Sequence, residues 1–501
     1  MTPSSRDEKR ALIIGAGPAG LCAADELLNS GWTVSIIESH PTHVGGLART
    51  EVFEGFRFDI GAHRFFTKNA DIQRWWSEQL GADLLTVDRY TRILYRGKFF
   101  NYPLQLHNVF HTLGLLESAR CAASFVAARL RSGSGERSYE DWIVRRFGRR
   151  LFETFFRTYT EKVWGMPCSD ISADWAAQRI KGLSLVQLVS AALGVKPRAV
   201  VRTLVDRFSY PRLGAGMLWE RVRTDLEKRG AQFVLGERLI GLSHQDGRIV
   251  SAQTIDSTGR ATLRNADVFV STMPMAGLAQ SFAPPLGDAA QKAAASLRYR
   301  DLLLVFMIID RADVFPDHWI YIHDPSVRVG RIANFRNWSR DMVPDDSKTG
   351  LALDYFCNDG DDLWRQDDKA IALLATREIE KLGFASSSEV LGAKVLRVEK
   401  AYPVLDANYR DAVSIIRAAI DPFENLFLAG RNGMHKYNNQ DHSMLTGRIV
   451  ARAANGDSVS PWHVNIDAEY HESEPLNDAA RATPELHARP RSPLSVGQEV
   501  A

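Results

Sequence analysis

The feature that most constrains the fold is a glycine-rich turn set between a strand pattern and a helix pattern. The apolar run at Ala11–Ile14 predicts a buried strand, and GAGPAG at Gly15–Gly20 follows it directly. Apolar residues then recur at helical spacing up to Gly31, which is placed to end the helix. A second strand is predicted over Thr33–Ile37 and ends at Glu38. The sequence therefore predicts a βαβ unit at the front of the chain.

Each glycine of this G-x-G-x-x-G turn has its own task. Gly15 permits the tight turn, Gly17 lets a pyrophosphate approach the backbone, and Gly20 lets the helix pack on the strand. Ala19 lies in the first turn of the helix, whose unpaired N–H groups carry a partial positive charge. Glu38 stands at the spacing of an acid that binds a ribose, which disfavours a 2′-phosphate and hence NADP. We therefore expect a dinucleotide site at this turn.

Composition and charge narrow the class of protein. The 501 residues are 45% apolar and 24% charged, as in ordinary globular proteins, and 62 Lys+Arg against 60 Asp+Glu leave a net charge of +2. A protein that coats nucleic acid usually has a basic surplus, so we expect no nucleic-acid partner. The four cysteines stand far apart, without a CxxC pair, and no apolar run approaches the roughly 20 residues of a membrane span. We expect a soluble, cytoplasmic protein.

Further glycine-bearing segments favour FAD over NAD as the dinucleotide. GGLART at Gly45–Thr50 and GFRFDIGAHRF at Gly55–Phe65 suit a backbone laid along an extended FAD. Near the end, NLFLAGR leads to NNQDHS at Asn438–Ser443 and a helix, whose N-terminus would face the flavin pyrimidine oxygen. These segments resemble the glutathione-reductase-type FAD fold of amine oxidases, protoporphyrinogen oxidases and sugar mutases. The resemblance adds to the FAD site Gly45, Gly46, Leu47, Gly61, Ala62, His63, Gly430, Asn439, Gln440, Asp441 and Ser443.

The predicted fold class is α/β, a glutathione-reductase-type FAD-binding Rossmann fold with interleaved helical and mixed-sheet substrate domains. The predicted units are an FAD-binding domain (8–70, 206–285 and 422–455), a mostly helical insert (71–205), a mixed α/β substrate domain (286–421) and a C-terminal tail (456–501). The tail is expected to be disordered after about residue 473, where large apolar residues become few. No second G-x-G-x-x-G follows a strand, so no separate nicotinamide domain is expected.

Blocks outside the FAD unit resemble one family, the UDP-galactopyranose mutases, especially the longer eukaryotic-type members. The similarity runs from Ala11 to Ala453 and includes the helical insert. It is carried by GAHRFF, GKFFNYPLQ, SYEDWIVRRFG, YTEKVWGMP, SADWAAQRIKG, HWIYIHDPSVRVGR, AYP and GRNGMHKY. Two departures from the family pattern concern the substrate site. Thr160 stands where the family often has asparagine, and the spacing from Tyr437 to NQD is two residues shorter.

The resemblance implies a substrate site over the flavin. Its catalytic residues would be His63, beside the flavin, with Arg331 and Arg431 on the leaving diphosphate, which forked guanidinium groups suit. Tyr102 and Gln105 would hold the base, since a tyrosine face and an amide suit a uracil ring. The other implied substrate-binding residues are Thr160, Trp164, Arg179, Trp319, Tyr321, Tyr402 and Tyr437.

The activity that the resemblance implies is redox-neutral. An FAD-dependent mutase would interconvert the pyranose and furanose forms of a nucleotide-diphosphate sugar, with N5 of the reduced flavin attacking the anomeric carbon. An external reductant such as NAD(P)H would first reduce the flavin. The alternative is an oxidoreductase of the protoporphyrinogen oxidase or amine oxidase type, because the arginines also suit substrate carboxylates. A flavin-binding scaffold without chemistry is a third possibility. No HExxH, GxSxG or P-loop motif and no Cys/His cluster occurs, so we expect no metal site.

Overall fold

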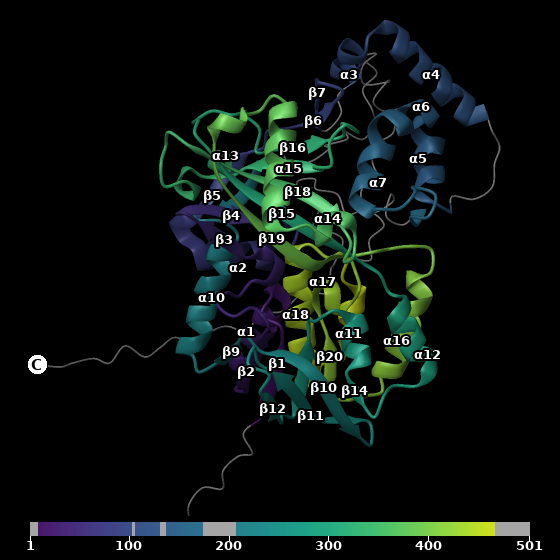
Figure 1. Ribbon diagram of the computed structural model, residues 1–501. Helices are drawn as coiled ribbons and strands as arrows, with labels where there is room; N and C mark the ends of the chain where they lie inside the picture. Colours follow the sequence, from purple (N-terminus) through teal and green to yellow (C-terminus); the bar gives the residue numbers. More distant parts are fainter. Residues whose placement is uncertain (1–8, 103–105, 131–136, 174–206, 466–501) are drawn as a thin grey trace, which may run out of the picture.

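The structure is a computed structural model, and it describes residues 9–102, 106–130, 137–173 and 207–465. A five-stranded parallel sheet lies in the lower half of the molecule in Figure 1. Its strand order is β20 (Leu426–Leu428), β13 (Val268–Ser271), β1 (Arg10–Ile14), β2 (Thr33–Glu38) and β9 (Gln232–Leu235). The start, middle and end of the chain therefore build one sheet, with β1 at its centre.

Both faces of this sheet are covered, and the side chains of β1 alternate between them. Ala11 and Ile13 pack toward one group of helices, whereas Leu12 and Ile14 pack toward the other face. The first face is covered by α1 (Pro18–Asn29), α2 (Ala70–Leu80), α10 (Gly216–Lys228) and α18 (Gln440–Ala454). The second is covered by α11 (Met275–Gln280), α12 (Asp288–Ser296), α16 (Tyr409–Ile420) and a four-stranded sheet of β12 (Ala261–Arg264), β11 (Arg248–Ile255), β10 (Arg238–Gln245) and β14 (Phe282–Ala283).

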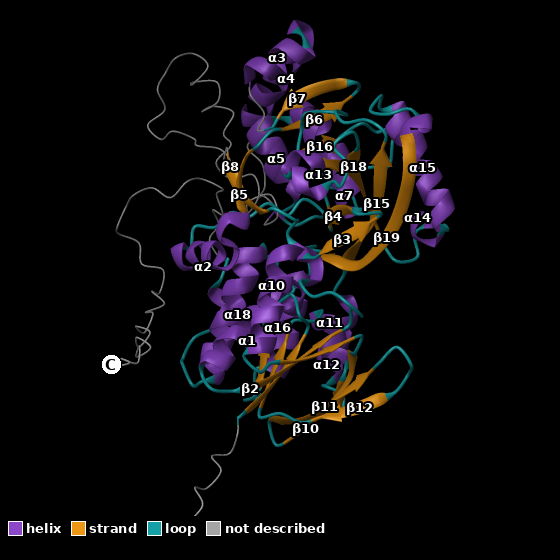
Figure 2. Cartoon of the chain, turned by 90° about the vertical axis from the view of Figure 1, so that its left-hand side faces the viewer, coloured by secondary structure: helices purple, strands orange, loops and turns teal. Residues whose placement is uncertain are grey.

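A second, seven-stranded sheet lies above the first (Figures 1 and 2). Its order is β19 (Val390–Pro403), β15 (Tyr299–Ile309), β18 (Thr349–Cys357), β17 (Arg331–Asn334), β16 (Trp319–Ile322), β6 (Thr91–Tyr95) and β7 (Lys98–Asn101). The predicted strand Leu302–Ile309 lies within β15 and is buried throughout. Its alternate residues pack toward α15 (Asp368–Lys381) on one side and toward the hairpin of β3 (Thr50–Phe53) and β4 (Phe56–Asp59) on the other.

A helical lobe extends from the seven-stranded sheet, away from the parallel sheet, in both views. It consists of α3 (Leu106–Leu113), α4 (Leu115–Leu130), α5 (Tyr139–Phe147), α6 (Arg149–Leu151), the π-helical η3 (Phe152–Arg157) and α7 (Thr158–Trp164). Its core contains Trp142, Phe152 and Trp164. The short helices α13 (Phe335–Trp338), α14 (Asp362–Arg365) and α17 (Gly430–Gly433) complete the described helices outside the 3-10 turns.

The insert that was predicted to be mostly helical, 71–205, contains helices and also three short strands, β5 (Leu84–Asp88), β6 and β7. β5 pairs with β8 (Arg207–Pro211), and β6 with β7 extends the sheet of the predicted substrate domain. β6 runs parallel to β16, with Thr91 in register with Trp319. β5 and β6 escape a local sequence pattern because their partners β8 and β16 lie far along the chain.

Four further predictions concern membrane spans, cysteines, metal ligands and the C-terminal tail. None of the described helices is long and apolar enough to cross a membrane. The four cysteines are free and buried. Within the described ranges, no group of three or more His, Cys, Asp or Glu is placed to hold a metal ion. The tail is described only as far as residue 465, so its expected disorder after about residue 473 falls on residues outside the description.

Candidate active site

The glycine turn of the βαβ unit has the close contacts that its motif predicts. Gly15 has a φ of +100°, and a Cβ there would stand 2.3 Å from Thr272 Oγ1. A Cβ on Gly20 would stand 2.0 Å from the carbonyl oxygen of Gly15. Gly17, the N-cap of α1, is different, because a Cβ there would meet nothing within 4 Å. The turn is closed against the sheet and open at Gly17, where a pyrophosphate would approach the backbone.

A second glycine pair lies against this turn. The Gly45 N–H donates to the Ala16 carbonyl at 2.8 Å, and a Cβ on Gly46 would stand 3.3 Å from Gly17 Cα. Glu38 is buried at the end of β2, and its Oε2 accepts a hydrogen bond from the Ala16 N–H at 2.8 Å. The carboxylate therefore holds the turn in place from the position of the predicted ribose acid. Its contact with a ribose stays a prediction.

The N-terminus of α18 forms the other end of the predicted FAD site. Asn439 is the N-cap, and Asp441 and Ser443 are buried in the first turn. Gln440 Oε1 accepts a hydrogen bond from Trp219 Nε1 at 3.1 Å. The buried Nε2 of Gln440 has no hydrogen-bond partner among the described residues. An unsatisfied amide donor at a helix N-terminus suits the oxygen atoms of a flavin ring.

Helix α18 lies directly on α1, which brings the two ends of the FAD site together. A Cβ on Gly447 would stand 2.1 Å from the carbonyl oxygen of Ala19. A Cβ on Gly430 would stand 3.1 Å from the Ala19 Cβ, and the Gly430 N–H donates to Thr446 Oγ1 at 3.0 Å. The open turn at Gly17 and the amide at the start of α18 therefore lie on two helices in direct contact, and these residues fit an FAD that reaches both.

His63 lies near both arginines that are predicted for the substrate site, whose charges add to burial in lowering its pKa. Its Nε2 lies 2.6 Å from the Ile60 carbonyl oxygen. Burial, followed by the charge of Arg431, lowers the pKa of His63 to about 4, so the ring is neutral near pH 7 and Nε2–H donates to that carbonyl. Leu47 and Ala62 pack against the core of the seven-stranded sheet nearby. We therefore place a neutral histidine at the boundary between the two sites.

Arg331 and Asp354 form a buried ion pair on neighbouring strands. They stand opposite each other in the register of β17 and β18, and Arg331 Nε donates to Asp354 Oδ2 at 2.5 Å. Burial is the largest single effect and lowers the pKa of Arg331. The charge of Asp354, together with smaller effects from Tyr402, Tyr159 and Tyr321, raises that pKa above its ordinary value. A Cβ on Gly61 would stand 2.9 Å from Arg331 Nη2, which places this pair beside the His63 loop.

Arg431 has different surroundings. The rings of Tyr402 and Tyr437 are nearly parallel, with centroids 5.9 Å apart, and Arg431 Cζ lies 5.6 Å and 5.0 Å from their centroids. Its Nε donates to the Asn438 carbonyl at 2.8 Å, and Nη1 lies 3.4 Å from the Ala401 carbonyl. In the part of the chain that the structure describes, no carboxylate pairs with Arg431. No carboxylate of the described ranges therefore offsets its positive charge.

An aromatic group continues the site toward the helical lobe. The Tyr321 ring meets the Tyr102 ring edge-to-face at 5.0 Å, the Tyr159 ring at 5.4 Å and the Trp319 ring at 6.3 Å. Tyr159 in turn stacks on His323 at 4.6 Å. The buried Trp319 Nε1 has no hydrogen-bond partner among the residues described. Tyr102, Trp319 and Tyr321, all predicted for the substrate site, therefore lie together.

Two predicted substrate residues lie in the core of the helical lobe. Trp164, at the end of α7, is 4% exposed. Thr160 is buried, and its hydroxyl donates to Tyr139 Oη at 3.2 Å. Tyr402 and Tyr437 pack against the core that contains Trp164, so this core adjoins the site. The structure gives Trp164 and Thr160 a packing role, and their contact with substrate stays a prediction.

Two residues of this region, Asp354 and Tyr159, were not predicted from the sequence. Asp354 had a signal, because it is the single acid in the apolar run LALDYF, and a charge in a buried strand needs a partner. Tyr159 had none, because it is one of many aromatic residues in a helical segment. Gln105 and Arg179, which were predicted for the base and the substrate, lie outside the described residues.

A match to a protein-family model shows the family to which this chain belongs. The model "Flavin containing amine oxidoreductase" matches residues 18–455, most of the chain. The chain belongs to the flavin-containing amine oxidoreductases. It is therefore a flavin-dependent enzyme, and FAD fits between the open turn at Gly17 and the amide of Gln440.

Curated relatives of this flavoenzyme include two sugar mutases. Over 171 residues it is 28% identical to a probable UDP-galactopyranose mutase of Klebsiella pneumoniae and 28% identical to dTDP-fucopyranose mutase of Escherichia coli. Each match covers 33% of this chain and 44% of the relative, so the chain matches less than half the length of either. The suspected resemblance to UDP-galactopyranose mutases is confirmed.

Solved structures agree on the fold. A reduced UDP-galactopyranose mutase superposes with a TM-score of 0.78 at 21% identity, over 91% of this chain and 99% of the other. A protein described as a putative protoporphyrinogen oxidase from Exiguobacterium gives a TM-score of 0.68 at 18% identity, over 90% and 98%. The predicted α/β class is therefore confirmed. Both structures share this fold, so the fold alone does not choose between the two chemistries.

Proposed function

We propose that this flavoenzyme is a mutase that interconverts the pyranose and furanose forms of a nucleotide-diphosphate sugar, with FAD in its reduced state. The observation that carries the proposal is Arg431, set beside the parallel rings of Tyr402 and Tyr437 with no carboxylate partner among the described residues. A fixed guanidinium with neighbouring hydroxyls suits a diphosphate that leaves and returns.

Arg431 is the residue that we assign to the diphosphate. The carbonyls of Asn438 and Ala401 orient its guanidinium through Nε and Nη1, and the remaining N–H donors are available to phosphate oxygens. Each charge-assisted hydrogen bond contributes about 1.5–3 kcal/mol. Arg331 would add a second set of donors, held in one orientation by Asp354. Because Asp354 offsets the charge of Arg331, Arg331 would orient the diphosphate more than it would attract it.

The other residues orient and enclose the substrate. Reduced FAD would supply the covalent chemistry. His63 is neutral and its Nε2–H is engaged by Ile60, so it holds the loop beside the flavin position and adds no charge there. The rings of Tyr102 and Tyr321, edge-to-face at 5.0 Å, would receive the nucleotide base.

The substrate that we propose is a pyrimidine nucleoside diphosphate bound to a hexose. The relatives that support it are named for UDP-galactopyranose and dTDP-fucopyranose, which share a pyrimidine base, a diphosphate and a six-membered sugar ring. An external reductant such as NAD(P)H would keep the flavin reduced.

A ligand titration tests the proposed substrate class. The FAD-loaded enzyme is titrated with UDP, dTDP and uridine, and binding is followed calorimetrically. Both diphosphates should bind at least about tenfold more tightly than uridine, because only they reach the arginines. Equal affinities for UDP and uridine would remove the diphosphate from the proposal.

An oxidoreductase that acts on a carboxylate-bearing substrate is the second candidate. The ion pair between Arg331 and Asp354 favours this candidate. Asp354 offsets the charge of Arg331, so of the two arginines only Arg431 lacks a carboxylate partner among the described residues. One uncompensated guanidinium suits a substrate with a single carboxylate. Oxygen uptake by the oxidised enzyme with such a substrate, together with no affinity for UDP, would establish this reading.

A further inference from the structure

Helix α4 lies at the far end of the helical lobe (Figures 1 and 2). It carries a stripe of exposed apolar side chains. Leu115 is 90% exposed, Leu130 79%, Leu116 69% and Val126 54%. At 100° per residue, these four side chains lie within an arc of about 120° on one side of the helix. The same arc holds the exposed alanines Ala119, Ala123 and Ala127. An apolar face of this extent on a protruding helix indicates an interaction surface.

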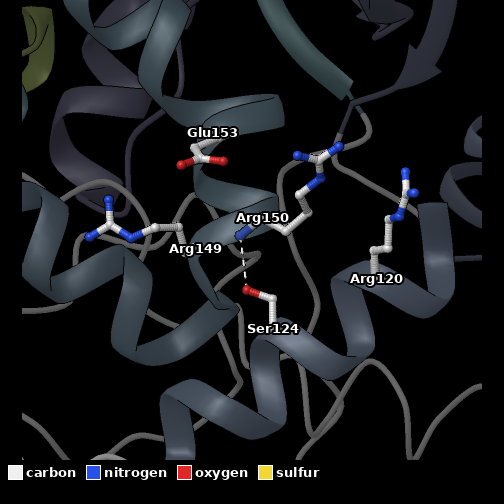
Figure 3. A pocket seen from close by; sticks show the side chains of 5 residues that line it. All are labelled: Arg120, Ser124, Arg149, Arg150 and Glu153. Atoms are coloured by element: carbon white, nitrogen blue, oxygen red, sulfur yellow. Dashed lines mark hydrogen bonds between the residues drawn. The ribbon is translucent and has the colours of Figure 1, made fainter.

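Arginines border this stripe. On the same helical wheel, Arg120 and Arg129 lie just beyond its two edges. Arg120 also lines a pocket of about 290 Å³ between α4 and the start of α6, together with Ser124, Arg149, Arg150 and Glu153 (Figure 3). The Arg150 N–H donates to Ser124 Oγ at 3.0 Å, which ties the two helices together at the pocket.

The carboxylates of this region lie deeper than its guanidinium groups. Glu117 pairs with Arg120 at 3.4 Å and also with Arg150, and Glu140 pairs with Arg149 at 2.7 Å. The arginine side chains are 59%, 45% and 54% exposed, in that order, whereas Glu117 is 23% and Glu140 25% exposed. The face that meets solvent is therefore cationic, although each arginine has an acidic partner beneath it.

The sequence from α3 to η3 also has a positive net charge. Residues 106–157 contain nine arginines and five acidic residues, a net charge of +4, whereas the whole chain carries +2 and its remainder therefore −2. Two copies of this lobe would repel each other, but an anionic surface would attract it.

We propose that the exposed side of α4, with Arg120, Arg149 and Arg150 beside it, docks on an anionic lipid bilayer. The leucines of the stripe would enter the headgroup region while the guanidinium groups bind lipid phosphates at its edge, as in amphipathic helices that lie in the membrane plane. The pocket in Figure 3, which Arg120, Arg149 and Arg150 line together with Ser124 and Glu153, would take one phosphate headgroup. This inference goes beyond the mutase proposal and does not depend on it.

Sedimentation with lipid vesicles tests the proposal on the full-length, FAD-loaded protein. We expect binding to phosphatidylcholine vesicles that contain phosphatidylglycerol, weak binding to phosphatidylcholine alone, and release by salt. The double variant Leu115→Glu/Leu130→Glu should lose at least about tenfold in partitioning. Leu373→Glu is the matched control, because Leu373 is an exposed leucine of α15, 50% exposed, and this variant should bind like the unmodified protein.

The cationic part of the proposal has its own test. Arg149→Gln should lower partitioning into anionic vesicles about fivefold, and Arg248→Gln, on the exposed side of β11, should not. Equal binding to neutral and anionic vesicles, or no binding to either, would overturn the proposal. So would self-association in light scattering that the double leucine variant abolishes, because the stripe would then join two copies. The FAD content of every variant reports that it is folded.

Discussion

The two arginines of the site are held in different ways, and this difference sets their expected tasks. Arg331 faces a carboxylate that is 1% exposed, so its charge is largely offset by Asp354. Arg431 is oriented by backbone carbonyls and lies beside two tyrosine rings. We therefore expect Arg431 to provide more of the affinity for an anion, and Arg331 to depend on its partner for its position.

Replacement of Arg431 tests its assignment to the diphosphate. Arg431→Ala should raise the Kd for UDP by about 10- to 100-fold, the loss of one or two charge-assisted hydrogen bonds, while FAD stays bound. Arg431→Lys should fall between, since it keeps the charge and loses the fork. Arg248→Ala, which removes an exposed arginine elsewhere, is the control. An unchanged Kd in Arg431→Ala would contradict the assignment.

Removal of the charge of Asp354 tests the buried pair. Asp354→Asn keeps the size of the side chain but leaves Arg331 without its countercharge, so the free energy of unfolding should fall by about 3 kcal/mol. Chemical denaturation measures this. Asp362→Asn breaks an exposed pair with Arg328 and should leave stability nearly unchanged. An equal loss of stability in Asp354→Asn and Asp362→Asn would contradict the expectation that the buried ion pair contributes more than the exposed one.

At the scale of elements, the βαβ unit shows why some parts of this fold can be predicted. Gly15 and Gly20 contact each other within six residues of chain, so the turn, its strand and its helix are specified locally. Local contacts also distinguish Gly17 from Gly20, although both belong to the same motif. The packing of the helix on the turn requires a glycine at position 20. At position 17 the protein leaves open space, which we expect a ligand to occupy.

Matched alanine substitutions test this distinction. Gly17→Ala should leave the stability of the apoprotein unchanged, because its φ of −78° suits alanine and its Cβ meets nothing, but it should weaken FAD binding at least about tenfold. Gly20→Ala should destabilise the apoprotein by about 1–3 kcal/mol, because its Cβ would meet a backbone oxygen at 2.0 Å. Retention of FAD by Gly17→Ala would contradict the placement of the pyrophosphate.

Other elements could not be read from the sequence, for physical reasons. Thr91 is fixed in β6 by its hydroxyl, which donates to the Trp319 carbonyl 228 positions away, and no local pattern reports such a partner. Most residues of the candidate site were implied by a family resemblance, and their roles stay predictions. Asp354 was not, because its role exists only where β17 and β18 bring it opposite Arg331.

At the scale of the whole molecule, buried titratable groups predict how stability depends on pH. Burial lowers the pKa of His63 and His435 to about 4, and that of His323 to about 3, from an ordinary value of 6.5. Between pH 6.5 and these values the unfolded chain binds protons that the folded chain does not, so acidification favours unfolding. Burial raises the pKa of Asp59 to about 6, which opposes the trend, because the folded carboxyl takes up a proton first.

Among these four groups, three histidines against one aspartate leave a net loss of stability on acidification. Burial also lowers the pKa of His318, which adds to this loss, and raises the pKa of Asp354, which opposes it. The free energy of unfolding should fall by roughly 2 kcal/mol per pH unit near pH 5. Denaturation series between about pH 4.5 and pH 7 measure the slope. His435→Gln should reduce it, since one proton uptake is removed, while exposed His111→Gln should not. A slope that is the same in both variants would contradict the account.

The measurement that tests the central claim most directly is turnover of a nucleotide sugar by the reduced enzyme. The FAD-loaded protein is reduced with dithionite without oxygen, incubated with UDP-galactose or dTDP-fucose, and the products are followed by chromatography and NMR. The account predicts a furanose isomer of unchanged mass, formed only by the reduced enzyme, and lost in Arg431→Ala. No isomer with any pyrimidine nucleotide sugar, together with oxygen consumption by the oxidised enzyme on another substrate, would contradict it.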